Sequence, residues 1–323
     1  MESCIMSSEL EVSPRKKMAM LFRPCIDLHA GKVKQIVGAT LKDATAATSA
    51  SAEENFVSEL PAAHFAARYR DDGLRGGHVI MLGPGNEEAA LSALRAYPNG
   101  MHVGGGITPA NAMKFIDAGA SHVIVTSYVF RNGAIDWERL DELVACVGKD
   151  RLVLDLSCRR KRDAGAGAGG EYFVVTDRWQ TYTDVAVNRA TLQKLAAYCA
   201  EFLVHGVDVE GTRTGIDDAL VRMLGACSPI PVTYAGGARD LSDMARVRVL
   251  GRGRVGLTIG SALDLFGGEC AYADVVAWDR SVASQRALRR GLAIGTGALV
   301  FAAGCWALWR KRQRDARTET VGN

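Results

Sequence analysis

The sequence predicts an α/β protein with a (β/α)8 TIM-barrel fold built from two similar half-barrels. Eight strand-like apolar runs alternate with helix-like segments, and three short motifs each occur twice in the same order. Alternating strands and helices indicate a parallel sheet, and eight such units indicate a closed barrel. A motif order that repeats at nearly constant spacing indicates internal duplication. An open, doubly wound sheet is the alternative, but it would not produce a repeat of four units plus four.

The repeated motifs all fall at the ends of predicted strands. The pairs are 25–29 (CIDLH) with 153–157 (VLDLS), 102–108 (HVGGGIT) with 233–239 (TYAGGAR), and 123–127 (VIVTS) with 257–261 (LTIGS). Their offsets are 128, 131 and 134 residues. Each half therefore has one strand that ends in an aspartate and two that end in small residues.

The first half contains four predicted strand–helix units. A further alternating stretch (32–37) and a long loop (42–55) separate the first strand from its helix. Apolar runs between glycines suit strands buried on both faces, and Thr108-Pro109 is a typical helix start. The strands are expected at 21–28, at 78–82, in a run that ends at the glycines 104–106, and at 122–126. The helices are expected at 61–72, 86–96, 108–118 and 135–147.

The second half repeats this alternation and adds one insertion. A basic segment that becomes rich in glycine and alanine (159–170) follows the fifth strand, and a small hairpin is expected around 173–175. The strands are expected at 151–156, at 201–209, in a run that ends at 235, and at 255–259. The helices are expected at 191–200, at 217–226 and from about Asp240 onward. The barrel domain then covers residues 21–284.

Composition is that of an ordinary globular protein, with 48% hydrophobic and 23% charged residues. The net charge of +3 comes largely from the basic C-terminal tail, and no basic stripe for nucleic acid is present. The eight cysteines are scattered without a C-x-x-C pair, which argues against a metal site or a disulfide framework. Residues 1–20 are polar and then basic, and we expect a disordered extension there rather than an acid-poor transit peptide.

The C-terminal tail (285–323) is not needed to complete a barrel. Its stretch 291–309 has no charged residue, and nineteen helical residues span ~28 Å, close to the hydrocarbon thickness of a bilayer. Basic residues flank both ends, and Trp306 and Trp309 sit where an interfacial belt would place them. A buried terminal helix is the alternative. We expect a single membrane span that leaves the barrel facing the cytosol.

Asp27 and Asp155 are the candidate catalytic residues. Barrel enzymes carry their active sites at the C-terminal ends of the strands, and the repeat places these two aspartates on opposite sides of the ring. One carboxylate can then remove a proton while the other donates one. Either aspartate alone could be a helix cap or an ion-pair partner, but packing does not explain a symmetric pair.

The glycine-rich strand ends are candidate phosphate sites. Backbone N–H groups and helix N-termini attract phosphate, and each glycine motif directly precedes a predicted helix. Hydroxyl groups in the partner loops would add further donors. The candidate residues are Gly104, Gly105, Gly106, Thr126 and Ser127 in the first half and Gly236, Gly237, Gly260 and Ser261 in the second. Together they predict a small-molecule substrate with a phosphate at each end, with no cofactor and no metal.

Several longer motifs resemble the eukaryotic branch of the histidine-biosynthesis isomerase family, the phosphoribosylformimino-5-aminoimidazole carboxamide ribotide (ProFAR) isomerases. The resemblance covers about residues 21–280. The motifs are FRPCIDLHAGKVKQIVG (22–38), VGGGIT (103–108), VIVTSYVF (123–130), RLVLDLSCRRK (151–161), WQTYTD (179–184), HGVDVEGTRTGID (205–217), YAGGARD (234–240) and IGSALDLFGG (259–268).

This resemblance implies a (β/α)8 barrel that catalyses a cofactor-free Amadori rearrangement of the aminoaldose ProFAR into the aminoketose PRFAR. Asp27 would be the general base at C2′, and Asp155 the general acid that assists opening of the furanose ring. Trp179 would stack on the imidazole from a mobile loop, which the insertion at 163–170 lengthens. His205 stands where the bacterial branch has a threonine, and it is either a supporting residue or a buried structural histidine.

Two alternative functions remain at this level. The cyclase barrel of imidazole glycerol phosphate synthase shares the duplicated fold and both aspartates, but the strings LSCR and WQTYTD favour the isomerase. A membrane-tethered barrel without catalytic activity would serve as a scaffold, but both aspartates and both glycine loops are present. We expect a monomeric barrel that acts on a bis-phosphorylated substrate.

Overall fold

The computed structural model describes residues 21–36, 54–161, 170–177 and 179–285. The chain divides into two compact units, residues 1–276 and residues 277–323. The barrel belongs to the first unit, and residues 277–285 of the second are helical. The predicted N-terminal extension (1–20) and most of the predicted tail (286–323) lie outside the described residues.

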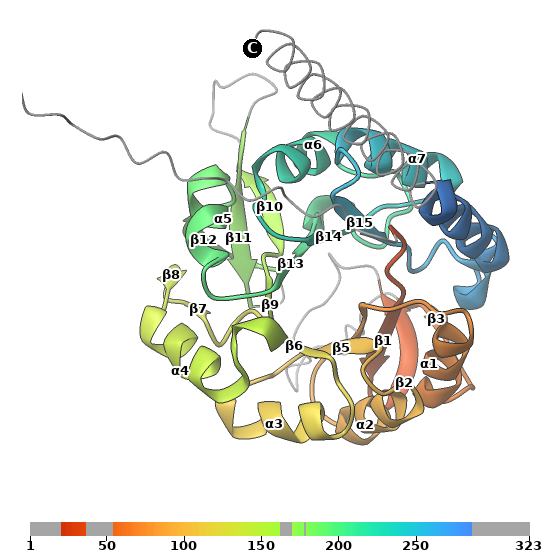
Figure 1. Ribbon diagram of the computed structural model, residues 1–323, viewed down its shortest axis with the longest axis horizontal. Coiled ribbons are helices and arrows are strands. Elements are labelled where there is room, and N and C mark those ends of the chain that lie inside the picture. Colours follow the sequence, from red (N-terminus) through yellow and green to blue (C-terminus); the bar gives the residue numbers. More distant parts are fainter. Residues whose placement is uncertain (1–20, 37–53, 162–169, 178, 286–323) are drawn as a thin grey trace, which may run out of the picture. The chain divides into compact units, whose positions relative to one another are not determined.

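Eight parallel strands form the inner ring of the first unit (Figure 1). They are β1 (Cys25–His29), β4 (Gly77–Met81), β5 (Met101–Gly104), β6 (His122–Val125), β9 (Leu152–Asp155), β13 (Glu201–His205), β14 (Val232–Ala235) and β15 (Val255–Thr258). A parallel bridge between Phe22 and Leu257 joins the last strand to the first. The Arg23 N–H donates to the Leu257 carbonyl at 2.8 Å, and the Leu257 N–H donates to the Leu21 carbonyl at 2.6 Å. The ring is therefore closed, and the predicted (β/α)8 barrel is confirmed.

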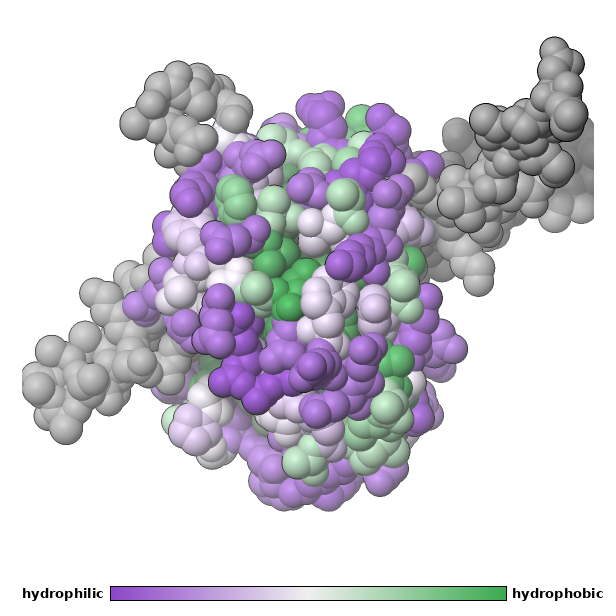
Figure 2. All heavy atoms as spheres, turned by 90° about the vertical axis from the view of Figure 1, so that its left-hand side faces the viewer, coloured by the Kyte–Doolittle hydropathy of each residue, from purple (hydrophilic) through white to green (hydrophobic). Residues whose placement is uncertain are grey.

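The helices surround the strands in chain order, as the colours of Figure 1 show. They are α1 (Ala62–Asp71), α2 (Glu87–Ala96), α3 (Pro109–Asp117), α4 (Trp137–Val147), α5 (Arg189–Leu195), α6 (Asp218–Cys227) and α7 (Leu241–Leu250). Helix α4 is typical: Leu140, Leu143 and Val147 are buried at helical spacing, and Asp136 caps its N-terminus. On the flank of the molecule beside α4 and α5, hydrophilic residues predominate around a central hydrophobic patch (Figure 2).

Short antiparallel strands extend the barrel around its open end. Strands β2 (Lys32–Ile36) and β3 (Glu54–Val57) continue the sheet from β1. A separate three-stranded sheet consists of β10 (Cys158–Lys161), β11 (Glu171–Thr176) and β12 (Thr181–Ala186), and β7 (Phe130–Arg131) pairs with β8 (Ala134–Ile135). The predicted hairpin near 173–175 is therefore one strand of a larger sheet. Strand β3 occupies part of the predicted loop at 42–55.

Three predicted boundaries were wrong for local physical reasons. The first strand begins at Cys25 rather than at 21, because Pro24 has no N–H for a sheet hydrogen bond. The strand predicted at 201–209 ends at His205, after which Val207–Val209 form a 3₁₀ turn. The helix predicted at 191–200 is α5, which starts earlier because the Asn188 side chain caps it by accepting the Thr191 N–H.

The predicted membrane span (291–309) lies outside the described residues, as does most of the glycine- and alanine-rich insertion at 163–170. Within the described part of the chain, no helix combines the length and apolarity that crossing a bilayer requires.

Strand register decides which side chains lie beside the two aspartates. Asp27 on β1 pairs with Ile80 on β4, and Asp155 on β9 pairs with Leu203 on β13. Leu203 packs with Ile124 and Val153 in a buried cluster that Ile80 joins. The aspartates therefore stand on a rigid, close-packed framework, which holds catalytic groups more precisely than loops do.

Candidate active site

A cavity of about 350 Å³ opens at the C-terminal ends of the barrel strands. This is the face where barrel enzymes carry their active sites. Eleven of the thirteen residues predicted from the sequence line it. They are Asp27, Gly105, Thr126, Ser127, Asp155, Trp179, His205, Gly236, Gly237, Gly260 and Ser261. Both repeated halves therefore contribute equivalent strand ends to one cavity.

Gly104 and Gly106 are not among the lining residues. A Cβ atom on Gly104 would lie 2.9 Å from Ile80 Cδ1, so this glycine allows close packing inside the barrel. Gly105, between them, does line the cavity and has φ 96°. A Cβ atom there would lie 2.1 Å from the Met81 carbonyl oxygen, so only glycine fits this backbone.

The second glycine loop is built in the same way. Gly236 and Gly237 have φ 125° and 72°, and a Cβ atom on Gly237 would lie 2.2 Å from the Gly215 carbonyl oxygen. The following helix α7 is capped by Asp240, which accepts the N–H groups of Ser242 and Asp243. Helix α3 after the first loop has its own capping box, formed by Thr108 and Asn111. Both helix N-termini are therefore capped by side chains of their own, which leaves the loop N–H groups as the candidates for anion binding.

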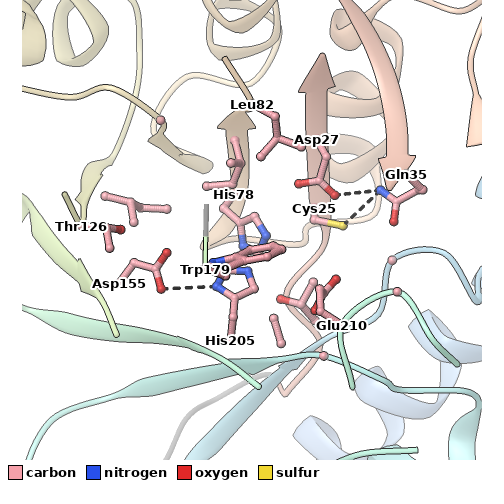
Figure 3. Close-up of a pocket in the computed structure, with 18 of the residues that line it drawn as sticks. Cys25, Asp27, Gln35, His78, Leu82, Thr126, Asp155, Trp179, His205 and Glu210 are labelled. Atoms are coloured by element: carbon pink, nitrogen blue, oxygen red, sulfur yellow. Dashed lines mark hydrogen bonds and ion pairs between the residues drawn. The ribbon is translucent and has the colours of Figure 1, made fainter. Parts of the chain in front are cut away.

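Asp27 is held by a neighbouring strand and has a perturbed pKa. Gln35 Nε2 on β2 donates to Asp27 Oδ2 at 2.9 Å (Figure 3). Burial and the negative charge of Glu210 together raise the pKa of Asp27 to about 6, although His205, Gln35 and Cys25 act in the opposite direction. A carboxylate with this pKa is ionised at neutral pH and is still basic enough to remove a proton from a carbon atom.

Asp155 is part of a compact polar cluster with Ser157 and His205. The Ser157 hydroxyl donates to Asp155 Oδ1 at 2.9 Å, and His205 Nδ1 lies 3.3 Å from the same oxygen. Burial alone would lower the pKa of His205, but the charge and hydrogen bond of Asp155, with Glu210 and Asp27, raise it to about 9. His205 is therefore an imidazolium at neutral pH, and this side of the cavity holds an exchangeable proton.

Trp179 lies in the cavity next to His205. Their ring centroids are 5.9 Å apart with an interplanar angle of 39°. Trp179 has φ 69°, a conformation that side chains with a Cβ atom adopt rarely and that is concentrated at functional sites. It comes from the turn between β11 and β12, so the sheet that carries the insertion also places an aromatic ring over the site.

The lining residues that were not predicted from the sequence include four with polar or charged side chains near the aspartates or the glycine loops: Gln35, His78, Glu210 and Arg213. Gln35 lies on the alternating stretch after the first strand, on the side shared by Val33, and that pattern could have placed it near Asp27. His78 is buried, and burial lowers its pKa to about 3, so it stays neutral.

Glu210 and Arg213 both lie in the HGVDVEGTRTGID motif (205–217). The family resemblance of this motif did not predict a role for either residue. Burial raises the pKa of Glu210, and its Oε2 atom is buried without a hydrogen-bond partner among the described residues. Arg213 is the only arginine or lysine in the described lining of the cavity. It stands on the turn whose Gly215 N–H donates to the Gly237 carbonyl at 2.8 Å, next to the second glycine loop.

Comparison with known proteins gives a consistent family. Residues 22–270 match the model of the family described as "Histidine biosynthesis protein". A Medicago truncatula protein, named as the chloroplastic 1-(5-phosphoribosyl)-5-((5-phosphoribosylamino)methylideneamino)imidazole-4-carboxamide isomerase, is 55% identical over 267 residues, which are 82% of this chain and 83% of that protein. Proteins with the same isomerase name from Neurospora crassa and Saccharomyces cerevisiae are 52% and 42% identical, each over 80% of this chain and 98% and 97% of their own lengths. The chain belongs to the histidine biosynthesis protein family.

Proposed function

We propose that this chain is an aldose–ketose isomerase of histidine biosynthesis that converts ProFAR into PRFAR. One observation carries this function: two aspartates at equivalent strand ends, Asp27 and Asp155, line one cavity between two equivalent glycine loops. The relatives are named as isomerases of this compound, and these names do not favour the cyclase or the scaffold alternative.

The chemistry needs an acid first and a base second. The Asp155–His205 pair protonates the furanose ring oxygen as its bond to C1′ breaks, which leaves a protonated Schiff base at C1′. Asp27 then removes the C2′ proton, and the electron pair moves into the C1′–C2′ bond to form an enolamine. A proton delivered to C1′ and the loss of the hydroxyl proton at C2′ complete the aminoketose. His205 supports this sequence because its imidazolium lies 3.3 Å from Asp155 and can restore the spent proton.

The two glycine loops account for a substrate with a phosphate at each end. Gly105, Thr126 and Ser127 line one side of the cavity, and the equivalent residues after β14 and β15 line the other. Loop N–H groups and hydroxyls suit phosphate oxygens. Arg213 adds a full positive charge at the second loop, so we assign the tighter phosphate contact to that half. Trp179 covers the substrate between the two phosphates.

The direct test is turnover of ProFAR by the full-length chain, with PRFAR formation followed over time. Turnover that disappears in Asp27→Asn supports the isomerase. A chain that folds normally, leaves ProFAR unchanged and instead consumes PRFAR with ammonia would be a cyclase. A folded chain inactive in both assays would be a scaffold.

We further propose that residues 291–309 anchor the protein to an intracellular membrane, with the barrel facing the cytosol. The support is the uncharged nineteen-residue stretch between basic flanks. Fractionation of cells that express the full chain, and of cells that express residues 1–290, tests this. The anchor is supported if alkaline carbonate leaves only the full chain in the membrane pellet, and it is contradicted if both proteins are released.

A further inference from the structure

Three potential metal ligands of different chemistry lie together on the floor of the cavity. One ligand atom from each of Cys25, Asp27 and His78 lies within 4.8 Å of the others. Cys25 and Asp27 are two residues apart on β1 and therefore share one face of the strand. His78 is the direct partner of Cys25 on the adjacent strand β4. The grouping follows from barrel register, since His78 is more than fifty positions from the other two residues in the sequence.

We propose that Cys25, Asp27 and His78 form a binding site for a thiophilic divalent cation such as Zn²⁺. Zn²⁺ prefers thiolate, imidazole and carboxylate ligands, at metal–ligand distances that place tetrahedral donors about 3.3–3.8 Å apart. The three ligand atoms, all within 4.8 Å of one another, lie close to that spacing. Thiolate and imidazole ligands select Zn²⁺ or another soft cation over Mg²⁺ or Ca²⁺. The Cys25 thiol loses its proton to solvent as the metal–sulfur bond forms.

The surroundings support a cation at this place. Gln35 Nε2 donates to one oxygen of Asp27 at 2.9 Å and lies 3.9 Å from Cys25 Sγ, so it orients two of the three ligands. Glu210 also lines the cavity, and its buried Oε2 atom has no hydrogen-bond partner in the described part of the chain. Figure 3 shows Cys25, Asp27 and Gln35 at one side of the cavity, away from Asp155. The fourth coordination position of a bound ion would face the open cavity.

A bound ion would occupy Asp27 and thereby inhibit the enzyme. This consequence depends on the proposed role of Asp27 as general base, whereas metal binding itself does not. The binding and inhibition measurements are therefore made separately, so that failure of the proposed isomerase activity leaves the metal site testable.

The binding test uses the full chain and Co²⁺ as a spectroscopic probe, with Zn²⁺ added in competition. We expect a near-ultraviolet band from a cobalt–thiolate bond, at one ion per chain, that Zn²⁺ removes. Cys25→Ala should abolish the band, while Cys199→Ala, which changes a buried cysteine outside the cavity lining, should retain it. A band that persists in Cys25→Ala would place the ion on another cysteine and overturn the proposal, as would the absence of any thiolate band in the unmodified chain.

A further variant, His78→Gln, and the inhibition of each variant by Zn²⁺ separate coordination from general damage to the fold. His78→Gln should weaken Zn²⁺ binding by at least the roughly 10–100-fold that loss of an outer-sphere partner causes. Inhibition by Zn²⁺ is measured for each variant relative to its own metal-free rate, and it should be lost with Cys25→Ala and kept with Cys199→Ala. Equal Zn²⁺ affinity in His78→Gln and the unmodified chain would remove His78 from the site and contradict the three-ligand arrangement.

Discussion

The two halves of the barrel place an aspartate at equivalent strand ends but surround it differently. Asp27 receives a hydrogen bond from a neutral amide, Gln35, whereas Asp155 contacts a cationic histidine, His205. Each half also contributes one histidine to the cavity. One histidine precedes the residue that pairs with the aspartate, and the other follows it. His78 lies two residues before Ile80, the strand partner of Asp27, and His205 lies two residues after Leu203, the strand partner of Asp155.

This difference in position along the strand explains why the two histidines carry different charges. His78 is buried below the level of Asp27, and desolvation lowers its pKa to about 3. His205 reaches Asp155 at the open end of the barrel, and its pKa is raised to about 9. A duplicated framework thus produces a proton-accepting side around Asp27 and a proton-holding side around Asp155 and His205. In the proposed mechanism, the two nearly symmetric halves perform opposite proton transfers because the residues around their aspartates differ.

The largest expected effect comes from removing either carboxylate. Asp27→Asn and Asp155→Asn should each lower kcat by about 10²–10⁴-fold, the usual contribution of one general acid or base. Steady-state kinetics with ProFAR measures this. Asp208→Asn is a suitable control, because Asp208 forms an exposed ion pair with Arg159 and does not line the cavity. A near-normal kcat in either cavity variant would remove that aspartate from the chemical step.

The two histidines should differ in the same assay. His205→Gln should lower kcat/KM by about 10²-fold, because it removes the group that holds the proton next to Asp155. It should also abolish the loss of activity above a pH of about 9. His78→Gln should keep that alkaline limb, since His78 is already neutral throughout the assay range. Identical pH–rate profiles for the two variants would contradict the assigned asymmetry.

The aspartates should also differ in their effect on stability. In the folded protein the pKa of Asp27 is about 6, whereas an unperturbed aspartate has a pKa of 3.8. The folded state therefore loses stability as the pH rises from about 4 to about 6, because the unfolded chain ionises more readily. Asp27→Asn should therefore stabilise the protein at pH 7, by about 1–3 kcal/mol. Asp155→Asn should destabilise it, because His205 then loses its partner. Urea unfolding at pH 7 checks both signs, and stabilisation by Asp155→Asn would contradict the ion-pair interpretation.

The smallest expected effect is a shift of the pH profile by Glu210→Gln. The unmodified enzyme should gain activity as pH rises through about 6, where Asp27 ionises, and lose it above about 9, where His205 deprotonates. Glu210 raises both pKa values, so its neutral replacement should move both limbs to lower pH. The measurement is kcat/KM between pH 5 and 10. A shift in only one limb would show that Glu210 acts on one half of the site alone.

Strand–helix periodicity and the repeated motifs were sufficient to predict the barrel, the face that carries the cavity and nine of the residues that line it. Both features are local: apolar runs specify buried strands, and glycines specify backbone conformations that other residues cannot adopt. Asp27, Asp155 and the glycine loops could therefore be found from the sequence, because each stands at a recognisable strand end. The different outcomes for Gly104 and Gly105 show the limit of such a prediction, because these adjacent glycines differ in backbone conformation and in the atoms packed against them, and neither is visible in the sequence.

The partners of the two candidate catalytic aspartates came only from the tertiary structure. Strand register brings His78 beside Cys25, and the turn after β13 brings Glu210 and Arg213 into the cavity. The charge of each histidine depends on burial and on the distance to a carboxylate, and no local pattern contains either quantity. Composition and spacing thus predict which groups can react, whereas the closed barrel decides which of them hold a proton, because pKa values depend on neighbours far apart in the sequence.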